Sequence, residues 1–166
     1  MGILGAAIAL FGKSGSGSIG LRRRVEEHSG TTEPKDTILV IDDDSAFLDT
    51  MRTMLGGEGY NVLVSSSGPK GLDMMRYAGR DVGAVLLDFN MPRFNGAKTL
   101  EFLRKLRPNA KVLAVSGVQN SELPADFREG VDRFLSKPFS NAELLKTLGE
   151  ILDGNQAAGP SATATA

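Results

Sequence analysis

The chain has 166 residues, a hydrophobic fraction of 41% and a formal net charge of -1. These values are typical of a globular protein of one domain, and the small net charge argues against a protein that mainly coats nucleic acid. Cysteine is absent, which excludes disulfides, thiolate metal sites, cysteine nucleophiles and palmitoylation. This composition is compatible with the reducing cytoplasm, where we expect the protein to reside.

Residues 1–35 differ in composition from the rest of the chain, and we expect them to form a flexible leader. They begin with the apolar stretch MGILGAAIALFG, which is too short to span a bilayer and lacks the basic start of a signal peptide. Membrane contact by this stretch is the weaker interpretation. The glycine-rich run at 12–20 matches the residue pattern of phosphate-binding loops, but no strand and amphipathic helix flank it, so we do not expect it to bind phosphate.

Short apolar runs alternate with helical patterns between residues 36 and 153. The candidate strands are residues 38–41, 61–65, 84–87, 111–115 and 133–136. Three of these runs, ILVI, AVLL and VLAV, are continuously apolar, as is typical of strands covered on both faces in a parallel sheet. Residues 154–166 are small and polar, and we expect them to form a disordered tail.

The segments between and after these strands predict five helices. The first starts at Asp44 or Ser45 as its N-cap and stops at the glycine pair 56–57. The fourth must be short because Pro124 lies in its first turn, and the fifth starts with a capping box of Ser140 and Glu143. The apolar stripes are, helix by helix, Phe47, Leu48, Met51 and Leu55; Leu72, Met75 and Tyr77; Leu100, Leu103 and Leu106; Phe127 and Val131; Leu144, Leu145, Leu148 and Ile151.

Regular alternation of strands and helices predicts an α/β fold with a doubly wound parallel sheet. In such sheets, sites gather beyond the carboxyl ends of the strands. The residues that the sequence places at these ends are Asp42, Asp43, Asp44, Asp88, Ser116 and Lys137.

These strand-end residues together predict phosphoryl chemistry. Clustered carboxylates repel one another unless a cation offsets their charge, and an all-oxygen set of ligands suits Mg²⁺. Lys137 would add a positive charge and Ser116 a hydroxyl donor for phosphoryl oxygens. A carboxylate beside them is a competent nucleophile, so the cluster predicts transfer of a phosphoryl group to an aspartate.

The segments ILVIDDD, LLDFNMPRFNG, VLAVSG and FLSKPF follow one another in an order and spacing that resemble the receiver domain of bacterial two-component response regulators, over residues 36–153. The resemblance implies a flavodoxin-like sheet of five parallel strands in the order 2-1-3-4-5, flanked by five helices. It also implies that Asp88 is the phosphoacceptor and that Lys137 neutralises the phosphoryl group. Ser116 would bind the phosphate, and Ser116 and Phe134 would form the conformational switch.

The same resemblance implies a magnesium site. Asp43 and Asp88 would bind Mg²⁺ through their side chains, and Asn90 through its backbone carbonyl. Asp42 would act through a bound water. We expect the third aspartate of the run, Asp44, to cap the first helix and not to bind the metal.

We therefore expect a single-domain response regulator of a two-component system or phosphorelay, which is a phosphoacceptor switch and not an enzyme that turns over an external substrate. The expected partners are a histidine kinase or histidine phosphotransfer protein and a downstream protein, without direct contact to nucleic acid. Two alternatives are left open. One is a receiver-like interaction module that is not phosphorylated, against which the complete acidic set argues. The other is a Mg²⁺-dependent phosphatase, for which no segment is long enough to form a substrate cap.

Overall fold

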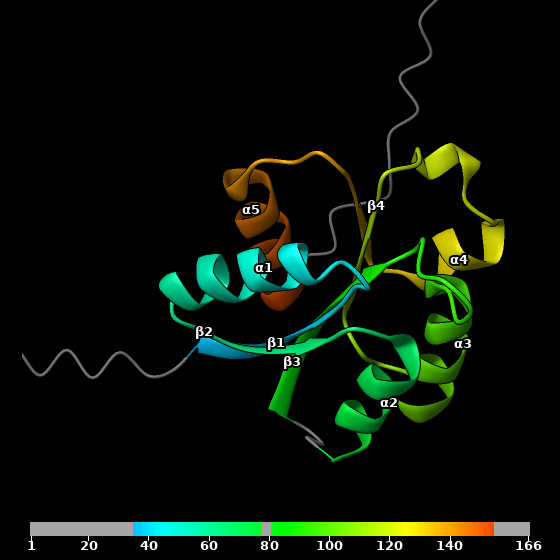
Figure 1. The fold of residues 1–166 in the computed structure, drawn as a ribbon, viewed down its shortest axis with the longest axis horizontal. Helices are drawn as coiled ribbons and strands as arrows, with labels where there is room; N and C mark the ends of the chain where they lie inside the picture. Colours follow the sequence, from blue (N-terminus) through cyan, green and yellow to red (C-terminus); the bar gives the residue numbers. More distant parts are fainter. Residues whose placement is uncertain (1–34, 78–80, 155–166) are drawn as a thin grey trace, which may run out of the picture. The chain divides into compact units, whose positions relative to one another are not determined.

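A parallel sheet of five strands forms the centre of the fold in the computed structural model, which describes residues 35–77 and 81–154 (Figure 1). The strands are β1 (Lys35–Ile41), β2 (Tyr60–Ser65), β3 (Val82–Asp88), β4 (Val112–Ser116) and β5 (Arg133–Ser136). Their order is β2-β1-β3-β4-β5, and every neighbouring pair is parallel. The predicted fold class and strand order are confirmed.

An α-helix follows each of the five strands, as predicted. These helices are α1 (Ser45–Gly57), α2 (Gly68–Tyr77), α3 (Gly96–Leu106), α4 (Ala125–Gly130) and α5 (Asn141–Leu152). A short 3-10 helix, η2 (Asn120–Glu122), precedes α4 and was not predicted. None of the helices in the described ranges is long and apolar enough to cross a membrane.

The sheet is covered on both faces because its central strands direct alternate side chains into two separate cores. Ile38 and Val40 of β1 lie in the core shared with α1 and α5, whereas Leu39 and Ile41 lie in the core shared with α2, α3 and α4. Figure 1 shows these two groups of helices on opposite sides of the sheet. All four side chains are at most 1% exposed, so β1 is buried on both faces of the sheet.

The helix ends show where local sequence signals were sufficient. Asp44 is the N-cap of α1, and its carboxylate accepts hydrogen bonds from the N–H groups of Ala46 and Phe47, which decides between the two predicted caps. The capping box of Ser140 and Glu143 starts α5 as predicted.

Two predicted members of the apolar stripes lie elsewhere. Tyr77 is 85% exposed because it is the last residue of α2 and extends beyond the surface that packs on the sheet. Val131 follows α4 instead of belonging to it, and packs partly buried against the core below that helix.

Candidate functional site

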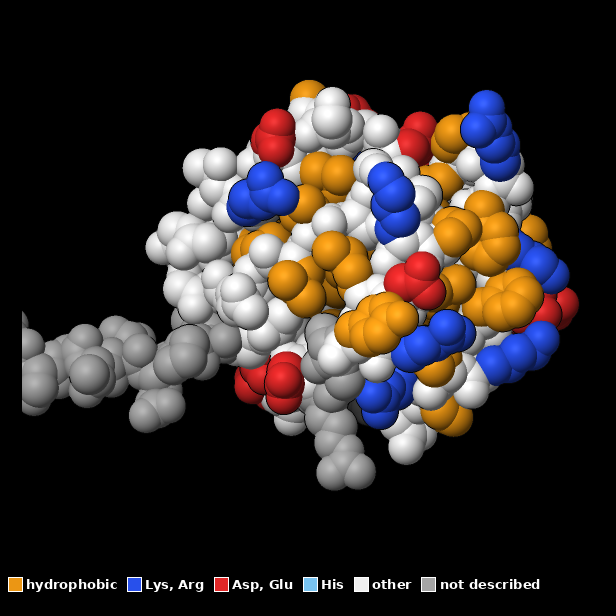
Figure 2. All heavy atoms as spheres, turned by 60° about the horizontal axis from the view of Figure 1, so that its bottom comes forward, with side chains coloured by type: hydrophobic (Ala, Val, Ile, Leu, Met, Phe, Trp, Pro, Cys, Tyr) orange, Lys and Arg blue, Asp and Glu red, His pale blue; other side chains and the backbone are white. Residues whose placement is uncertain are grey.

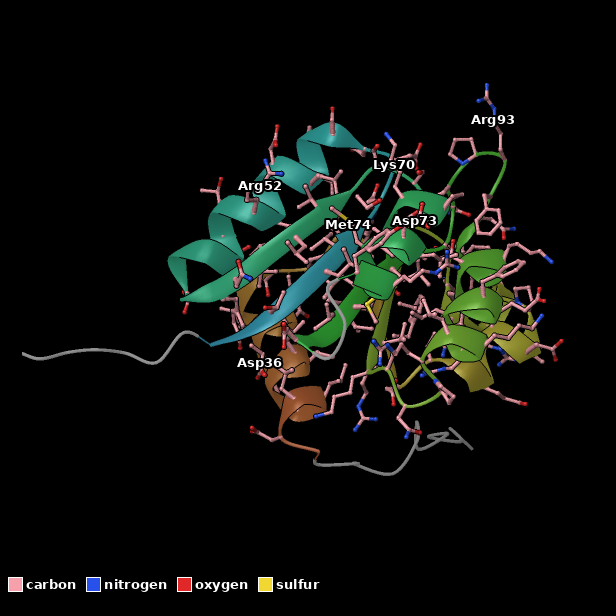
Figure 3. The ribbon with its side chains drawn as sticks, turned by 90° about the horizontal axis from the view of Figure 1, so that it is seen from below. Asp36, Arg52, Lys70, Asp73, Met74 and Arg93 are labelled. Atoms are coloured by element: carbon pink, nitrogen blue, oxygen red, sulfur yellow. The ribbon has the colours of Figure 1, made fainter. Side chains whose placement is uncertain are left out.

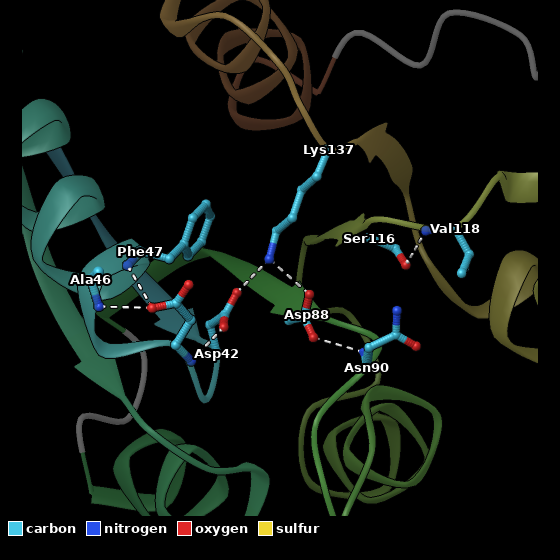
Figure 4. Close-up of polar contacts among 9 residues, drawn as sticks. Asp42, Ala46, Phe47, Asp88, Asn90, Ser116, Val118 and Lys137 are labelled. Carbon is cyan, nitrogen blue, oxygen red and sulfur yellow. Dashed lines mark hydrogen bonds and ion pairs between the residues drawn. The ribbon is translucent and has the colours of Figure 1, made fainter.

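The charged residues predicted at the strand ends meet in one ion-paired cluster (Figure 4). Lys137 Nζ lies 2.6 Å from Asp42 Oδ2 and 2.9 Å from Asp88 Oδ1. Asp42 follows β1, Asp88 ends β3, and Lys137 follows β5. Because β1 and β3 are neighbours in the sheet although a helix–strand–helix unit separates them in sequence, this edge is the topological switch point where α/β sheets bind their ligands.

Both carboxylates of the cluster are buried, and both are fully engaged. Asp42 is 2% exposed and Asp88 is 5% exposed. The second oxygen of Asp42 accepts a hydrogen bond from the N–H of Asp44 at 2.8 Å, and that of Asp88 from the N–H of Asn90 at 2.7 Å. A buried charge is tolerated only when it is paired and hydrogen-bonded, and these contacts meet that condition.

Burial and pairing shift the pKa values of the two central groups. Burial raises the pKa of Asp88 above its ordinary value, and the charge of Asp42 adds to this, while the hydrogen bonds from Lys137 and Asn90 only partly oppose it. Burial lowers the pKa of Lys137, but its hydrogen bonds and charge interactions with Asp42 and Asp88 together outweigh this effect and raise it. Lys137 is therefore a fixed positive charge facing two carboxylates at neutral pH.

A third carboxylate completes a set that could bind a cation. One carboxylate oxygen from each of Asp42, Asp43 and Asp88 lies within 4.8 Å of the other two, and the side chain of Asp43 is exposed to solvent. The set has three carboxylates and Lys137 is paired with two of them, so carboxylates outnumber the ammonium group. An all-oxygen set with this charge fits Mg²⁺, which prefers oxygen ligands and retains several waters.

Ser116 and Phe134, the two predicted switch residues, lie on β4 and β5. Ser116 is completely buried at the end of β4, and its Oγ accepts a hydrogen bond from the N–H of Val118 at 3.2 Å. Its carbonyl oxygen accepts a hydrogen bond from the N–H of Lys137 at 2.7 Å, which ties the two strand ends together. Phe134 pairs in register with Ala114 and packs partly buried against the core under α3 and α4.

The loop after β3 fixes the backbone of Asp88. The N–H of Gly96 donates to the carbonyl oxygen of Phe89 at 2.9 Å. A side chain at position 96 would collide with the carbonyl oxygen of Asp88, so only glycine permits this close approach. Arg93 in the same loop adopts a φ of 66° and extends away from the sheet (Figure 3).

One residue of the site was not identified from the sequence. Phe47 was predicted only as a member of the apolar stripe of α1, yet its ring centroid lies 4.1 Å from Lys137 Nζ. Its position three residues after the N-cap Asp44 places it in the first turn of α1, near the strand ends. That position was a usable signal, but the partner lies ninety residues away and could not be identified from local sequence.

Known proteins are similar to this chain in sequence. A sequence model of the response regulator receiver domain matches residues 38–149. The chain is 31% identical over 116 residues to the cell cycle transcriptional regulator CtrA of Caulobacter vibrioides, which covers 69% of this chain and 49% of CtrA. It is 34% identical over 135 residues to the sensor kinase CckA of Brucella abortus, covering 79% of this chain and 14% of CckA. The chain thus spans about half the length of the first relative and a small part of the second.

Solved structures give the same result for the fold. A CheY-like response regulator receiver domain protein from Methanospirillum hungatei is 32% identical, with a TM-score of 0.66 over 72% of this chain and 94% of that chain. The CheX-CheY-BeF3-Mg complex from Borrelia burgdorferi includes a chain that is 21% identical, with a TM-score of 0.66 over 70% of this chain and 88% of that chain. At that identity the second likeness concerns the fold alone.

Proposed function

The chain belongs to the response regulator receiver domain family, and we propose that it accepts a phosphoryl group on Asp88 in a Mg²⁺-dependent reaction and signals through the surface that this reaction changes. Receiver domains are phosphorylation switches and not turnover enzymes. The observation that carries the proposal is the ion-paired cluster, in which Lys137 lies between Asp42 and Asp88 and a third carboxylate, Asp43, is within ligand distance.

The contacts of Asp88 support its role as the nucleophile. The Asn90 N–H holds one carboxylate oxygen and the Lys137 ammonium holds the other, so the group is fixed before the donor arrives. As the bond between its oxygen and phosphorus forms, the phosphorus–nitrogen bond of a phosphohistidine donor breaks, and the electron pair stays with the imidazole nitrogen. Lys137 then offers its positive charge to the phosphoryl oxygens.

The acidic residues would hold the cation. We assign Asp43 and Asp88 as side-chain ligands of Mg²⁺, with the backbone carbonyl of Asn90, and Asp42 acting through water. When bound, Mg²⁺ supplies positive charge that offsets the repulsion between the carboxylates and the arriving phosphoryl group.

The switch would begin at Ser116. Its hydroxyl is buried at the end of β4 and can turn to donate to a phosphoryl oxygen on the neighbouring strand. We propose that Phe134 on β5 follows this movement. Because phenylalanine has no hydroxyl group, its response to phosphorylation would depend on packing alone.

The donor would be a histidine kinase or a histidine phosphotransfer protein, and the receiver of the signal a downstream protein. One relative is named a sensor kinase and another a transcriptional regulator, so receiver domains like this one occur in proteins at both ends of such a pathway. We propose cytoplasmic residence, with residues 36–153 as the receiver domain. The predicted leader (1–35) and tail (154–166) lie almost entirely outside the described residues.

Intact-mass spectrometry tests this function. We expect the wild-type protein, incubated with Mg²⁺ and acetyl phosphate, to gain one phosphoryl group, and the same protein in EDTA to gain none. Asp88→Asn should gain none in either condition. If folded wild-type protein forms no adduct and binds no beryllofluoride, the chain is the unphosphorylated interaction module and the proposal is wrong.

A further inference from the structure

We propose that Phe47 is a positioning residue, which holds the ammonium group of Lys137 beside the carboxylate of Asp88 for phosphoryl transfer. The inference rests on the proposed function. The ring centroid of Phe47 lies 4.1 Å from Lys137 Nζ, within the range of a cation–π interaction (Figure 4). The ammonium therefore has three partners, of which Asp42 and Asp88 are anionic and Phe47 is not.

The Phe47 ring is itself held in place. The carboxylate of Asp44 accepts a hydrogen bond from the Phe47 N–H at 3.3 Å, which fixes the backbone of the first turn of α1. The ring of Phe139 meets that of Phe47 edge-on, with centroids 6.2 Å apart and planes at 86°. Both rings are partly buried against the core under α1 and α5. Phe47 thus contacts the segment 137–139 at both of its ends.

A lysine needs such a support more than most residues do. Its ammonium sits on a flexible four-carbon stem, and holding it in one position costs side-chain entropy. The carboxylates of Asp42 and Asp88 hold the ammonium group by ion pairs, whose strength depends on the charge around them. A phosphoryl group arriving at Asp88 changes that balance, whereas the attraction of the aromatic face is unaffected. Phe47 therefore keeps the Lys137 ammonium within the site throughout the reaction.

A second lysine–phenylalanine contact in the same molecule provides a matched control. Lys98 and Lys105 each lie 5.2 Å from the ring centroid of Phe102 on α3, which is 41% exposed. Figure 2 shows basic side chains next to hydrophobic ones on the face that carries α2 and α3. This contact is of the same chemical type but involves none of the residues at the strand ends.

The test is the initial rate of adduct formation with acetyl phosphate at a fixed Mg²⁺ concentration. Phe47→Leu keeps apolar bulk but loses the aromatic face, and we expect it to react roughly three- to tenfold more slowly than wild type. Phe47→Tyr restores the face and should react within about twofold of wild type. Phe102→Leu should react at the wild-type rate. If Phe47→Leu does not fold, as judged by circular dichroism, Phe47→Met takes its place in the comparison.

A double-mutant cycle separates positioning from a general effect on the fold. In a Lys137→Met background, where the reaction is followed over hours, the Phe47→Leu change should have no further effect, because the group on which Phe47 acts is gone. An equal slowing in both backgrounds, or no slowing of Phe47→Leu in the otherwise wild-type protein, overturns the inference. If the wild-type protein forms no adduct and binds no beryllofluoride, this would instead overturn the proposed function on which the inference depends.

Discussion

Asp88 illustrates how a functional residue can cost stability. Its pKa is raised in the folded protein, chiefly by burial, so ionising it is less favourable after folding than before. The free energy of unfolding therefore depends on pH. The contribution of Asp88 is most favourable below its unfolded pKa of 3.8, where the carboxyl is neutral in both states, and this contribution is lost as the pH rises through the folded pKa. The site thus keeps a charge that folding alone would disfavour, and Lys137 offsets only part of that cost.

We predict that Asp88→Asn melts a few degrees higher than wild type at neutral pH in the absence of Mg²⁺. The amide removes the buried charge, while Lys137 keeps its partner Asp42. The difference in melting temperature should shrink as the pH falls through the raised pKa of folded Asp88, because the wild-type carboxyl then becomes neutral, and it should be smallest below the unfolded value of 3.8. Thermal melts over a pH series measure this, with Asp43→Asn as the exposed control. A lower melting temperature for Asp88→Asn at neutral pH would contradict the argument.

At the scale of elements, the three aspartates before α1 have two different roles, helix capping and formation of the carboxylate set. Asp44 caps the helix, whereas Asp42 and Asp43 face the cluster. We predict that Asp44→Ala lowers the free energy of unfolding by about 1 kcal/mol, while Asp44→Asn, which retains a capping oxygen, is close to wild type. Mg²⁺ should still raise the melting temperature of Asp44→Ala but not that of Asp43→Ala. Denaturation with and without Mg²⁺ gives both results, and loss of the Mg²⁺ effect in Asp44→Ala would show that the cap is also a ligand.

Arg104 links α3 to the end of α4. Its guanidinium donates to the carbonyl oxygen of Gly130 at 2.9 and 2.7 Å and to the carboxylate of Asp132 at 3.1 Å. Lysine cannot reproduce this fork, so Arg104→Lys should lower the free energy of unfolding by about 1–2 kcal/mol and increase hydrogen exchange in α4. Arg52→Lys is the control, because its ion pair with Asp49 is exposed and should contribute almost nothing. Equal effects of the two substitutions would argue against a specific role for Arg104.

The elements that the sequence predicted best are those whose signals are local. Short apolar runs located all five strands within three residues at either end, and Asp44 and Ser140 marked the starts of α1 and α5. The 3-10 helix η2 was missed because three residues carry no apolar periodicity; Gln119 and Glu122 hold it through a local hydrogen bond. The Arg104 contacts were missed because their partners lie 26 and 28 residues away.

For the whole molecule, topology explains why the site could be foreseen. Once the strands are parallel, their carboxyl ends share one edge, so Asp42, Asp88 and Lys137 had to converge although 95 and 49 residues separate Lys137 from the two aspartates. This property of parallel sheets predicts where the strand ends lie, but it does not predict where the side chains of the helices lie. The contact of Phe47 with Lys137 depends on how α1 packs on the sheet, which no pattern in the sequence specified.

The central claim is that Asp88 itself becomes an acyl phosphate, and chemical trapping tests it most directly. Protein incubated with Mg²⁺ and acetyl phosphate is reduced with borohydride, which converts an aspartyl phosphate to homoserine, and is then digested and sequenced by mass spectrometry. We predict homoserine at position 88, at no other aspartate, and only when Mg²⁺ is present. Homoserine at another aspartate, or a phosphoryl group on a hydroxyl side chain that borohydride leaves unchanged, would contradict the assignment of Asp88 as the phosphoacceptor.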